Sequence, residues 1–169
     1  MTKVLAVLML LVAVSAAAQP APPLAATDLT ALDIQSFIKQ LPRGTISDSP
    51  IRVVDVGGYK VGAFGVFRPK STVQDAVLHE TRITEVYYML DGAGTLVTGG
   101  RLIDPIGAPS GGSITTRRAK RIEGGVSRRV TKGDVIIIPA GTPHWWSELE
   151  GDISYLIVRP DPEGTLSLK

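Results

Sequence analysis

Two patterns of apolar and polar positions divide the chain. Over residues 28–42 the apolar side chains recur at three- and four-residue intervals, and Pro42 ends the run. This spacing predicts a short N-terminal helix, because residues three and four apart lie on one helix face. We expect this helix to pack on the domain or on a partner through an apolar stripe formed by Leu29, Leu32, Phe37, Ile38 and Leu41.

From residue 50 onward the pattern is that of β-strands. Short runs rich in β-branched and aromatic residues are separated by Gly, Pro and Asp at short intervals. The expected strands are 51–56, 59–68, 85–90, 95–98, 135–138 and 153–158. Four glycines are expected at turns, where other residues are disfavoured: Gly92, Gly94, Gly133 and Gly141. One helix and many short strands predict an all-β sandwich or barrel.

The first 18 residues have the layout of a secretory signal peptide. Lys3 precedes an unbroken apolar run, Val4–Val14, and the small residues Ala16–Ala18 follow it. The run is too short to span a bilayer comfortably, and a retained membrane anchor is the alternative. Residues 19–27 are rich in proline and alanine and are expected to be a linker. We therefore expect an exported protein, periplasmic or secreted, with no membrane attachment after cleavage.

The composition narrows the class of protein. A chain of 169 residues with 44% hydrophobic side chains can bury the core of one domain. The absence of cysteine excludes thiolate catalysis and cysteine-based metal sites. The formal net charge is +2, and it falls to +1 without residues 1–18 because Lys3 is their only charged side chain. Such a small charge does not indicate a nucleic acid as partner.

Residues 99–132 interrupt the strand pattern with a stretch rich in glycine and basic side chains. Its cations are Arg101, Arg117, Arg118, Lys120, Arg121, Arg128, Arg129 and Lys132. A long irregular segment within a small domain is usually functional or disordered. Two interpretations follow: a solvated hairpin extension, or a basic lid that attracts anionic substrates to the mouth of the barrel.

The chain has two histidines, His79 and His144, and Glu85 lies close to the first. His79 and Glu85 flank a predicted turn at residues 82–84, so the strands that leave this turn can direct both side chains into one interior. His144 follows a turn at residues 141–143 and begins another strand. Two imidazoles and one carboxylate, with coordination positions left open, match the facial triad of non-haem iron enzymes.

The segments around the two histidines resemble the paired sequence motifs of the cupin family. His79, Glu85 and Gly92 have the spacing of the first motif. Four residues match the second motif: Gly133, Pro139, Gly141 and His144. The resemblance covers about residues 50–160 and implies a cupin-type double-stranded β-helix, which is a jelly-roll barrel. It also implies a homodimer, since cupins commonly pair through barrel edges.

Three positions depart from the cupin pattern. Thr81 stands where the second histidine of the first motif is expected, Gln74 replaces the opening glycine, and Glu148 replaces an asparagine. A hydroxyl is a poor metal ligand beside imidazole, so the four-ligand set that the resemblance implies falls to His79, Glu85 and His144. The missing ligand either opens a coordination position for substrate or water, or weakens metal binding.

Other side chains are candidates for the pocket by strand parity. Glu148 has the parity of His144 and is a candidate general base, with a solvated carboxylate on the rim as the alternative. Tyr87 shares its face with the candidate carboxylate ligand and is a candidate catalytic, pocket-lining residue. Phe67 and Trp146 are further candidates, although aromatic residues on strands more often belong to the core.

Together these features predict an exported cupin that binds one divalent transition metal, with Fe, Mn, Zn, Ni and Cu not distinguished. The expected partner is a small organic molecule of anionic character, and the expected chemistry is that of a metal-dependent oxygenase, lyase or isomerase. Two alternatives remain, because a fold does not define a function. One is a non-catalytic small-molecule-binding module with weak or no metal. The other is a metal-free interaction protein whose helix and basic segment contact a partner.

Overall fold

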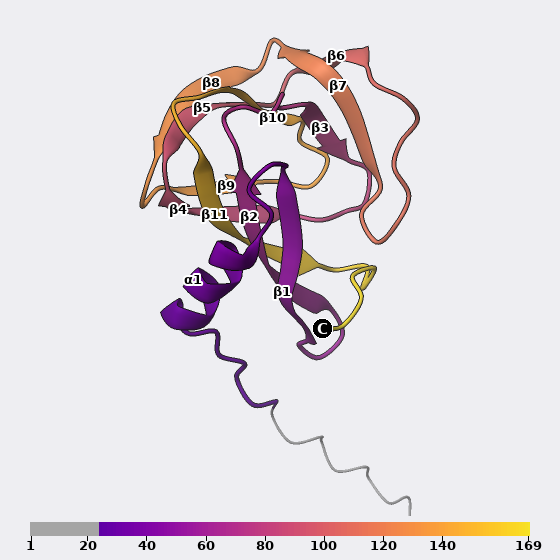
Figure 1. Cartoon of the computed structure of the whole chain (residues 1–169). Coiled ribbons are helices and arrows are strands. Elements are labelled where there is room, and N and C mark those ends of the chain that lie inside the picture. The colour runs from indigo at the N-terminus through magenta and orange to yellow at the C-terminus, as the bar shows by residue number, and fades with distance from the viewer. Residues whose placement is uncertain (1–23) are drawn as a thin grey trace, which may run out of the picture.

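The computed structural model describes residues 24–169, which fold into a barrel with one helix on its outside (Figure 1). The predicted signal peptide and the first part of the predicted linker lie outside the described residues. Residues 24–30 precede the helix without helical or strand structure. Within residues 24–169, no helix is both long enough and apolar enough to cross a membrane.

Helix α1, Ala31–Gln40, confirms the predicted N-terminal helix and has tighter bounds. Thr30 and Asp33 form a capping box, in which each side chain accepts a hydrogen bond from the backbone N–H of the other. The chain leaves the helix at Leu41, because the residue before Pro42 is restricted to extended backbone.

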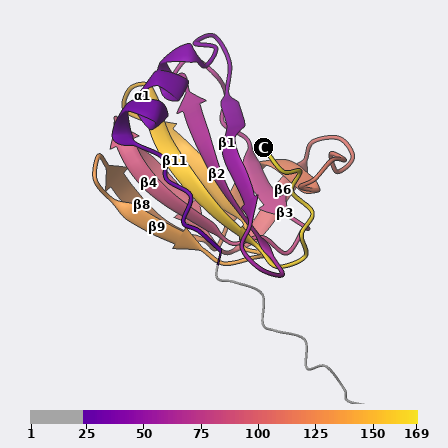
Figure 2. The ribbon, with the colours of Figure 1, turned by 90° about the horizontal axis from the view of Figure 1, so that it is seen from below.

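The apolar face of α1 packs on the outside of the barrel. Ile38 and Leu41 are buried against Phe67, and Phe37 packs beside them. Figures 1 and 2 show the helix lying outside strand β2, to which Phe67 belongs. Leu32 does not join this contact and is 72% exposed, because it lies on the opposite side of the helix. The predicted stripe is therefore wrong at this position.

In the described part of the chain, eleven strands form two antiparallel sheets that face each other (Figure 1). The five-stranded sheet contains, in spatial order, β1 (Ser47–Asp55), β2 (Lys60–Arg68), β11 (Ile153–Asp161), β4 (Glu85–Asp91) and β9 (Val135–Ile138). The six-stranded sheet contains β6 (Arg101–Pro105), β7 (Thr116–Glu123), β3 (Ala76–His79), β10 (His144–Leu149), β5 (Ala93–Thr98) and β8 (Val126–Thr131). This arrangement confirms the predicted all-β jelly-roll barrel with one short helix.

Apolar side chains fill the space between the two sheets. The largest buried cluster draws on both sheets and includes Tyr87, Leu96, Trp146 and Tyr155. Because neighbouring residues of a strand point to opposite faces, Val97 and Trp145 lie outside this core. They belong to a second, smaller apolar cluster with buried alanines of β3 and β7.

Residues 99–132 form strands in place of the irregular segment expected from the sequence. β6 and β7 pair as an antiparallel hairpin, and β8 pairs with β5 at the edge of the same sheet. Only residues 106–115 connect strands within this stretch as a long loop. The hairpin interpretation therefore describes residues 101–123. The strands were not expected because their outer face carries arginine and lysine, as is common where a sheet faces water.

A bulge in β10 changes the direction of the side chains after Trp146. The pairing of β10 with β5 shifts between Trp146 and Glu148, so one additional residue stands in β10. Glu148 is consequently exposed, although His144 and Trp146 are buried. Beside the bulge, Gly94 pairs with Leu149 and is a buried strand residue, not a turn residue as expected. The other glycines expected at turns have positive φ values: Gly92, Gly133 and Gly141.

Replacement of Gly94 by alanine is expected to destabilise the fold. A Cβ at this position would lie 2.6 Å from the carbonyl oxygen of Glu148, so the backbone of β5 or β10 must shift. We expect Gly94→Ala to lower the free energy of unfolding by about 1–3 kcal/mol in chemical denaturation. Gly44→Ala is the control, because nothing lies within 4 Å of its Cβ position. Equal stability of the two variants would contradict the described packing.

Candidate metal centre

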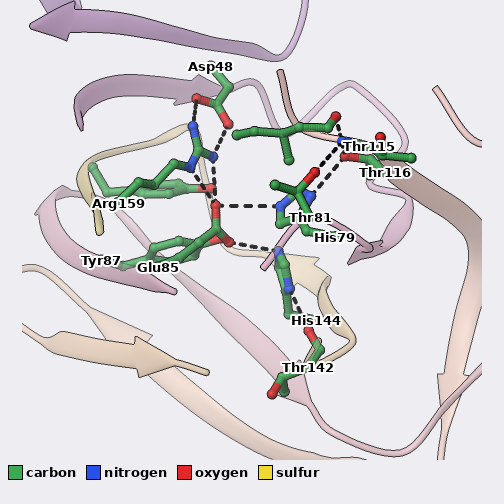
Figure 3. Close-up of polar contacts among 12 residues, drawn as sticks. Asp48, His79, Thr81, Glu85, Tyr87, Thr115, Thr116, Thr142, His144 and Arg159 are labelled. Carbon is green, nitrogen blue, oxygen red and sulfur yellow. Dashed lines mark hydrogen bonds and ion pairs between the residues drawn. The ribbon is translucent and has the colours of Figure 1, made fainter. Parts of the chain in front are cut away.

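The three predicted ligands meet inside the barrel, each at the end of a strand. His79 is the last residue of β3, Glu85 the first of β4 and His144 the first of β10. One ligand-type atom from each lies within 4.8 Å of the others (Figure 3). His79 Nε2 is 3.5 Å from Glu85 Oε1, and His144 Nε2 is 3.2 Å from Glu85 Oε2.

The two histidines come from one sheet and the glutamate from the other. His144 pairs with Val77 on β3, and His79 has the same parity as Val77, so both imidazoles project from one face. Residues 80–84 then cross to the facing sheet, anchored by buried Ile83. The strands on either side of the predicted turn therefore belong to different sheets and do not pair with each other. The two side chains meet because their strands face each other across the barrel.

The Nδ1 atom of each imidazole, which points away from Glu85, forms a hydrogen bond that determines which ring nitrogen carries the proton. His144 Nδ1 lies 3.1 Å from the carbonyl oxygen of Thr142, so this nitrogen carries the proton. His79 Nδ1 lies 2.8 Å from Thr116 Oγ1, whose own proton is donated to the Ile114 carbonyl at 3.4 Å. In the neutral rings both Nε2 atoms are therefore unprotonated, and their lone pairs face the carboxylate.

A buried arginine holds that carboxylate in place. Arg159 donates hydrogen bonds from Nε and Nη2 to Glu85 Oε1, at 2.8 and 2.6 Å. Its Nη1 and Nη2 also donate to the two oxygens of Asp48, at 2.9 and 2.5 Å. The guanidinium carbon lies 4.3 Å from the centre of the Phe64 ring. Since Arg159 and Glu85 are only 2% and 1% exposed, the charge-assisted bonds between these two residues lie in a region of low dielectric constant.

Glu85 and Arg159 remain ionised in this cluster. Burial raises the pKa of Glu85, the positive charge of Arg159 is the largest of the causes that oppose this, and the pKa is held well below 4.5. Burial lowers the pKa of Arg159, and the two carboxylates raise it by more, so the net direction is upward. Two carboxylates and one guanidinium leave the cluster with an excess negative charge, which favours a cation beside the imidazoles.

Tyr87 orients the second carboxylate oxygen. Its hydroxyl donates to Glu85 Oε2 at 3.1 Å, and its ring centre lies 4.7 Å from that of Tyr155. Burial, and then the negative charge of Glu85, raise the pKa of the Tyr87 phenol well above 10.0. The phenol therefore stays protonated and acts as a hydrogen-bond donor. The structure thus places Tyr87 beside the predicted ligands, as the sequence had suggested.

Thr81 occupies the position of the absent histidine but does not join the three ligands. Its Oγ1 accepts a hydrogen bond from the backbone N–H of Thr115 at 2.9 Å (Figure 3). The backbone N–H of Glu80 donates to the Thr115 carbonyl at 2.8 Å. Thr81 therefore holds Thr115, the last residue of the loop between β6 and β7, close to His79. The candidate ligands remain His79, Glu85 and His144.

The geometry of these residues fits a metal ion. Nitrogen and oxygen ligands lie roughly 2.0–2.2 Å from a bound transition metal, so two ligands of one ion are separated by roughly 3.0–3.5 Å. The separations of 3.2 and 3.5 Å between the Nε2 atoms and the carboxylate oxygens lie in this range. Unshared electron pairs facing one another at this distance repel unless a cation lies between them. His79, Glu85 and His144 could therefore hold a metal ion, whose identity the geometry does not select.

A cavity of about 550 Å³ opens beside the three ligands and is lined by residues of both sheets. Tyr87 is part of its wall, but three other predicted pocket residues are not. Glu148 is exposed because the β10 bulge reverses the expected parity. Phe67 faces outward and packs under α1. Trp146 is buried in the apolar core, where its Nε1 donates to the Tyr155 hydroxyl at 3.3 Å.

Sequence reasoning missed the residues that support the ligands, above all Arg159 and Asp48. A signal for Arg159 was present, because the buried residues of β11 alternate from Ile153 through Tyr155 and Ile157 to Arg159. Continuing the predicted strand beyond Val158 would have placed the arginine on the inner face. Asp48 lies before the first predicted strand and offered no such signal.

Removal of the Glu85 charge is expected to destabilise the protein in a pH-dependent way. The pKa of Glu85 is lower in the folded than in the unfolded state. The ionised carboxylate therefore adds to the free energy of unfolding above pH 4.5, and this addition is lost as the pH falls through the folded-state pKa. After treatment with chelator, Glu85→Gln should therefore be less stable than wild type by about 3 kcal/mol near pH 7, and the difference should shrink below pH 4.5.

Chemical denaturation at a series of pH values measures this difference. Glu150→Gln is the matched control, since Glu150 pairs with Arg129 on the surface, where an ion pair stabilises little. A difference between Glu85→Gln and wild type that stays constant from neutral to acidic pH would contradict the assignment.

Solved structures with a similar fold come from several organisms. TT1209 from Thermus thermophilus is 14% identical, with a TM-score of 0.48, and the alignment covers 80% of this chain and 98% of that one. KdgF from Halomonas sp. is 17% identical, with a TM-score of 0.40 and coverages of 64% and 86%. The DMSP lyase DddQ from Ruegeria pomeroyi is 13% identical, with a TM-score of 0.45 and coverages of 82% and 77%.

Comparison at the level of sequence gives a family assignment. A search of curated proteins finds no match. The family model described as Cupin matches residues 63–158, a segment that contains all three candidate ligands and more than half of the chain. The chain therefore belongs to the cupin family.

Proposed function

We propose that this cupin binds one divalent transition metal through His79, Glu85 and His144 and acts on a small organic molecule held in the adjoining cavity. The observation that carries the proposal is the convergence of two Nε2 atoms on one buried carboxylate. A bound metal would supply Lewis acidity toward a substrate oxygen or a site for dioxygen, as in oxygenases, lyases and isomerases.

The protein's own residues have separate tasks in this proposal. Thr142 and Thr116 fix the rotation and tautomer of the two imidazoles. Arg159 and Tyr87 each donate to one oxygen of Glu85, which keeps the carboxylate charged and in one orientation. Since His144 and Glu85 are buried and His79 is partly exposed, access to the centre is from the His79 side, where the cavity lies.

A non-catalytic binding module is the second candidate, and the position of Glu148 favours it. This carboxylate was the predicted general base, and the bulge directs it to solvent. The Tyr87 phenol, with its raised pKa, is a donor and not a base at neutral pH. A binding module would hold the same organic molecule without converting it. Turnover of a bound molecule by the metal-loaded protein distinguishes the two candidates.

Export and dimerisation are further parts of the proposal. Export is supported by the sequence of residues 1–18, with its apolar run and small-residue end. A homodimer is supported by the edge strand β9, whose side chains Val135 and Ile137 are 60% and 66% exposed beside exposed Tyr88. An exposed apolar strand at a sheet edge is a natural pairing surface for a second copy.

Elemental analysis tests the metal proposal. Protein purified without chelator should contain close to one transition metal ion per chain, and His79→Ala and His144→Ala should each lose it because two ligands rarely retain such an ion. Thr81→Ala is the matched control, since its hydroxyl bonds to Thr115 and not to the ligands, and it should retain the metal. Metal-free wild-type protein, even after reconstitution, would refute the proposal.

Light scattering during gel filtration tests the dimer. Replacement of both Val135 and Ile137 by lysine should convert a dimer into monomers, because a charged row at β9 opposes pairing. Val126→Lys is the control, since Val126 is 68% exposed on β8, one of the two edge strands of the other sheet. A double variant that remains dimeric would locate the interface elsewhere.

A further inference from the structure

Arg68, at the end of β2, differs from the other arginines of the cavity. The cavity wall contains Arg68, Arg118 and Arg159. Arg159 is paired with two carboxylates, and Arg118 Nη1 lies 3.6 Å from Asp75 Oδ2. Among residues 24–169, no ion pair joins Arg68 to an aspartate or glutamate. Arg68 is half-buried, so its charge is partly removed from water without a protein anion to compensate it.

Neutral partners hold the Arg68 guanidinium in a defined orientation. Nε donates to the Tyr155 hydroxyl at 2.7 Å, and Nη1 donates to Gln74 Oε1 at 3.0 Å. Gln74 is itself fixed, because its amide nitrogen donates to the carbonyl oxygens of Pro69 and Thr72. A guanidinium has five N–H donors, so three remain for a ligand in the cavity. Such a pre-oriented group is suited to bind a carboxylate through two hydrogen bonds.

The charges of the cavity wall favour an anion at this position. The three arginines balance the three carboxylates of Asp48, Asp75 and Glu85, so the wall is neutral overall while the imidazoles are neutral. A divalent cation at the three ligands would make the cavity positive. The carboxylates closest to that centre are engaged by Arg159, which leaves Arg68 as the cation available to an incoming anion.

Arg68 and the candidate metal centre are connected through two aromatic side chains. Arg68 contacts the Tyr155 hydroxyl, the Tyr155 and Tyr87 ring centres are 4.7 Å apart, and the Tyr87 hydroxyl contacts Glu85. Arg68 and Glu85 both belong to the wall of this cavity. A molecule that reaches both would present a carboxylate to Arg68 and a second oxygen group to the candidate metal centre.

We propose that Arg68 forms a carboxylate-binding subsite and that the molecule taken by this cavity is a small organic acid with a second oxygen donor. The identity of the acid rests on the proposed function, because its second oxygen would lie at the metal centre. The carboxylate contact itself does not require the metal. Arg68 is thus assigned to ligand recognition, and the three candidate metal ligands to the reacting end of the molecule.

Saturation-transfer NMR with succinate tests this subsite in chelator-treated and in zinc-loaded protein. We expect succinate to bind in both states and more tightly with zinc, and succinamide, its neutral analogue, not to bind. Arg68→Gln should raise the dissociation constant at least about tenfold in both states, whereas Arg68→Lys should recover part of the affinity. Arg129→Gln, which removes an arginine that pairs with Glu150 on the surface and does not line the cavity, should leave the dissociation constant close to that of wild type.

The two proposals fail in different ways in this experiment. Equal succinate affinity in wild type and in Arg68→Gln, or no binding of succinate by wild type in either state, overturns the subsite. If either of these results is found and the protein still binds one zinc ion per chain, the subsite is overturned and the metal proposal is supported. Absence of zinc binding, together with Arg68-dependent binding of succinate, overturns the metal proposal and supports the subsite. The amide NMR spectrum of each variant shows whether it is folded.

Discussion

Arg159 lies between Asp48 and Glu85 and forms hydrogen bonds with both carboxylates. The positions of the surrounding strands depend on this pairing of one cation with two anions. A carboxylate as deeply buried as Glu85 is expelled or protonated unless a cation and hydrogen-bond donors compensate it. Arg159 provides the cation, Tyr87 donates to the second oxygen, and Phe64 covers the guanidinium. Strand β11 must therefore direct Arg159 inward, and the start of β1 must bring Asp48 against it. The ligand geometry is a consequence of this pairing, since it fixes the direction in which Glu85 faces the imidazoles.

The site is built across the barrel, and its stability is coupled to that of the fold. The histidines project from neighbouring strands of one sheet, and the glutamate projects from the sheet that faces them. Any change that separates the sheets separates the ligands. Supporting contacts come from short, local features, such as the Thr142 carbonyl two residues before His144. The pairing of Thr81 with Thr115 adds a link between the end of the β6–β7 connection and the segment that crosses the barrel.

The three arginines that line the cavity differ in the partners that hold them. Arg159 forms ion pairs with Asp48 and Glu85. Arg118 is largely exposed and lies beside Asp75. Arg68 alone among these three is held by neutral groups. An anion in the cavity would therefore complete the pairing of charges that the protein leaves open at Arg68. The basic strands β7 and β8 add positive charge around the barrel, mainly on surfaces that face water.

The sequence by itself identified the fold class, the short helix and the three candidate ligands, because each leaves a local trace. Strand alternation, helical periodicity and the spacing around the only two histidines are properties of neighbouring residues. It could not show that Glu85 reaches the histidines from the opposite sheet. It also could not show that one additional residue in β10 turns Glu148 to solvent, since a bulge depends on the partner strand. The partnership of Arg159 with Asp48 joins residues 111 positions apart, and the neutral surroundings of Arg68 likewise depend on distant segments. Only the tertiary structure decides such contacts, because burial and charge pairing are set by what the chain brings together.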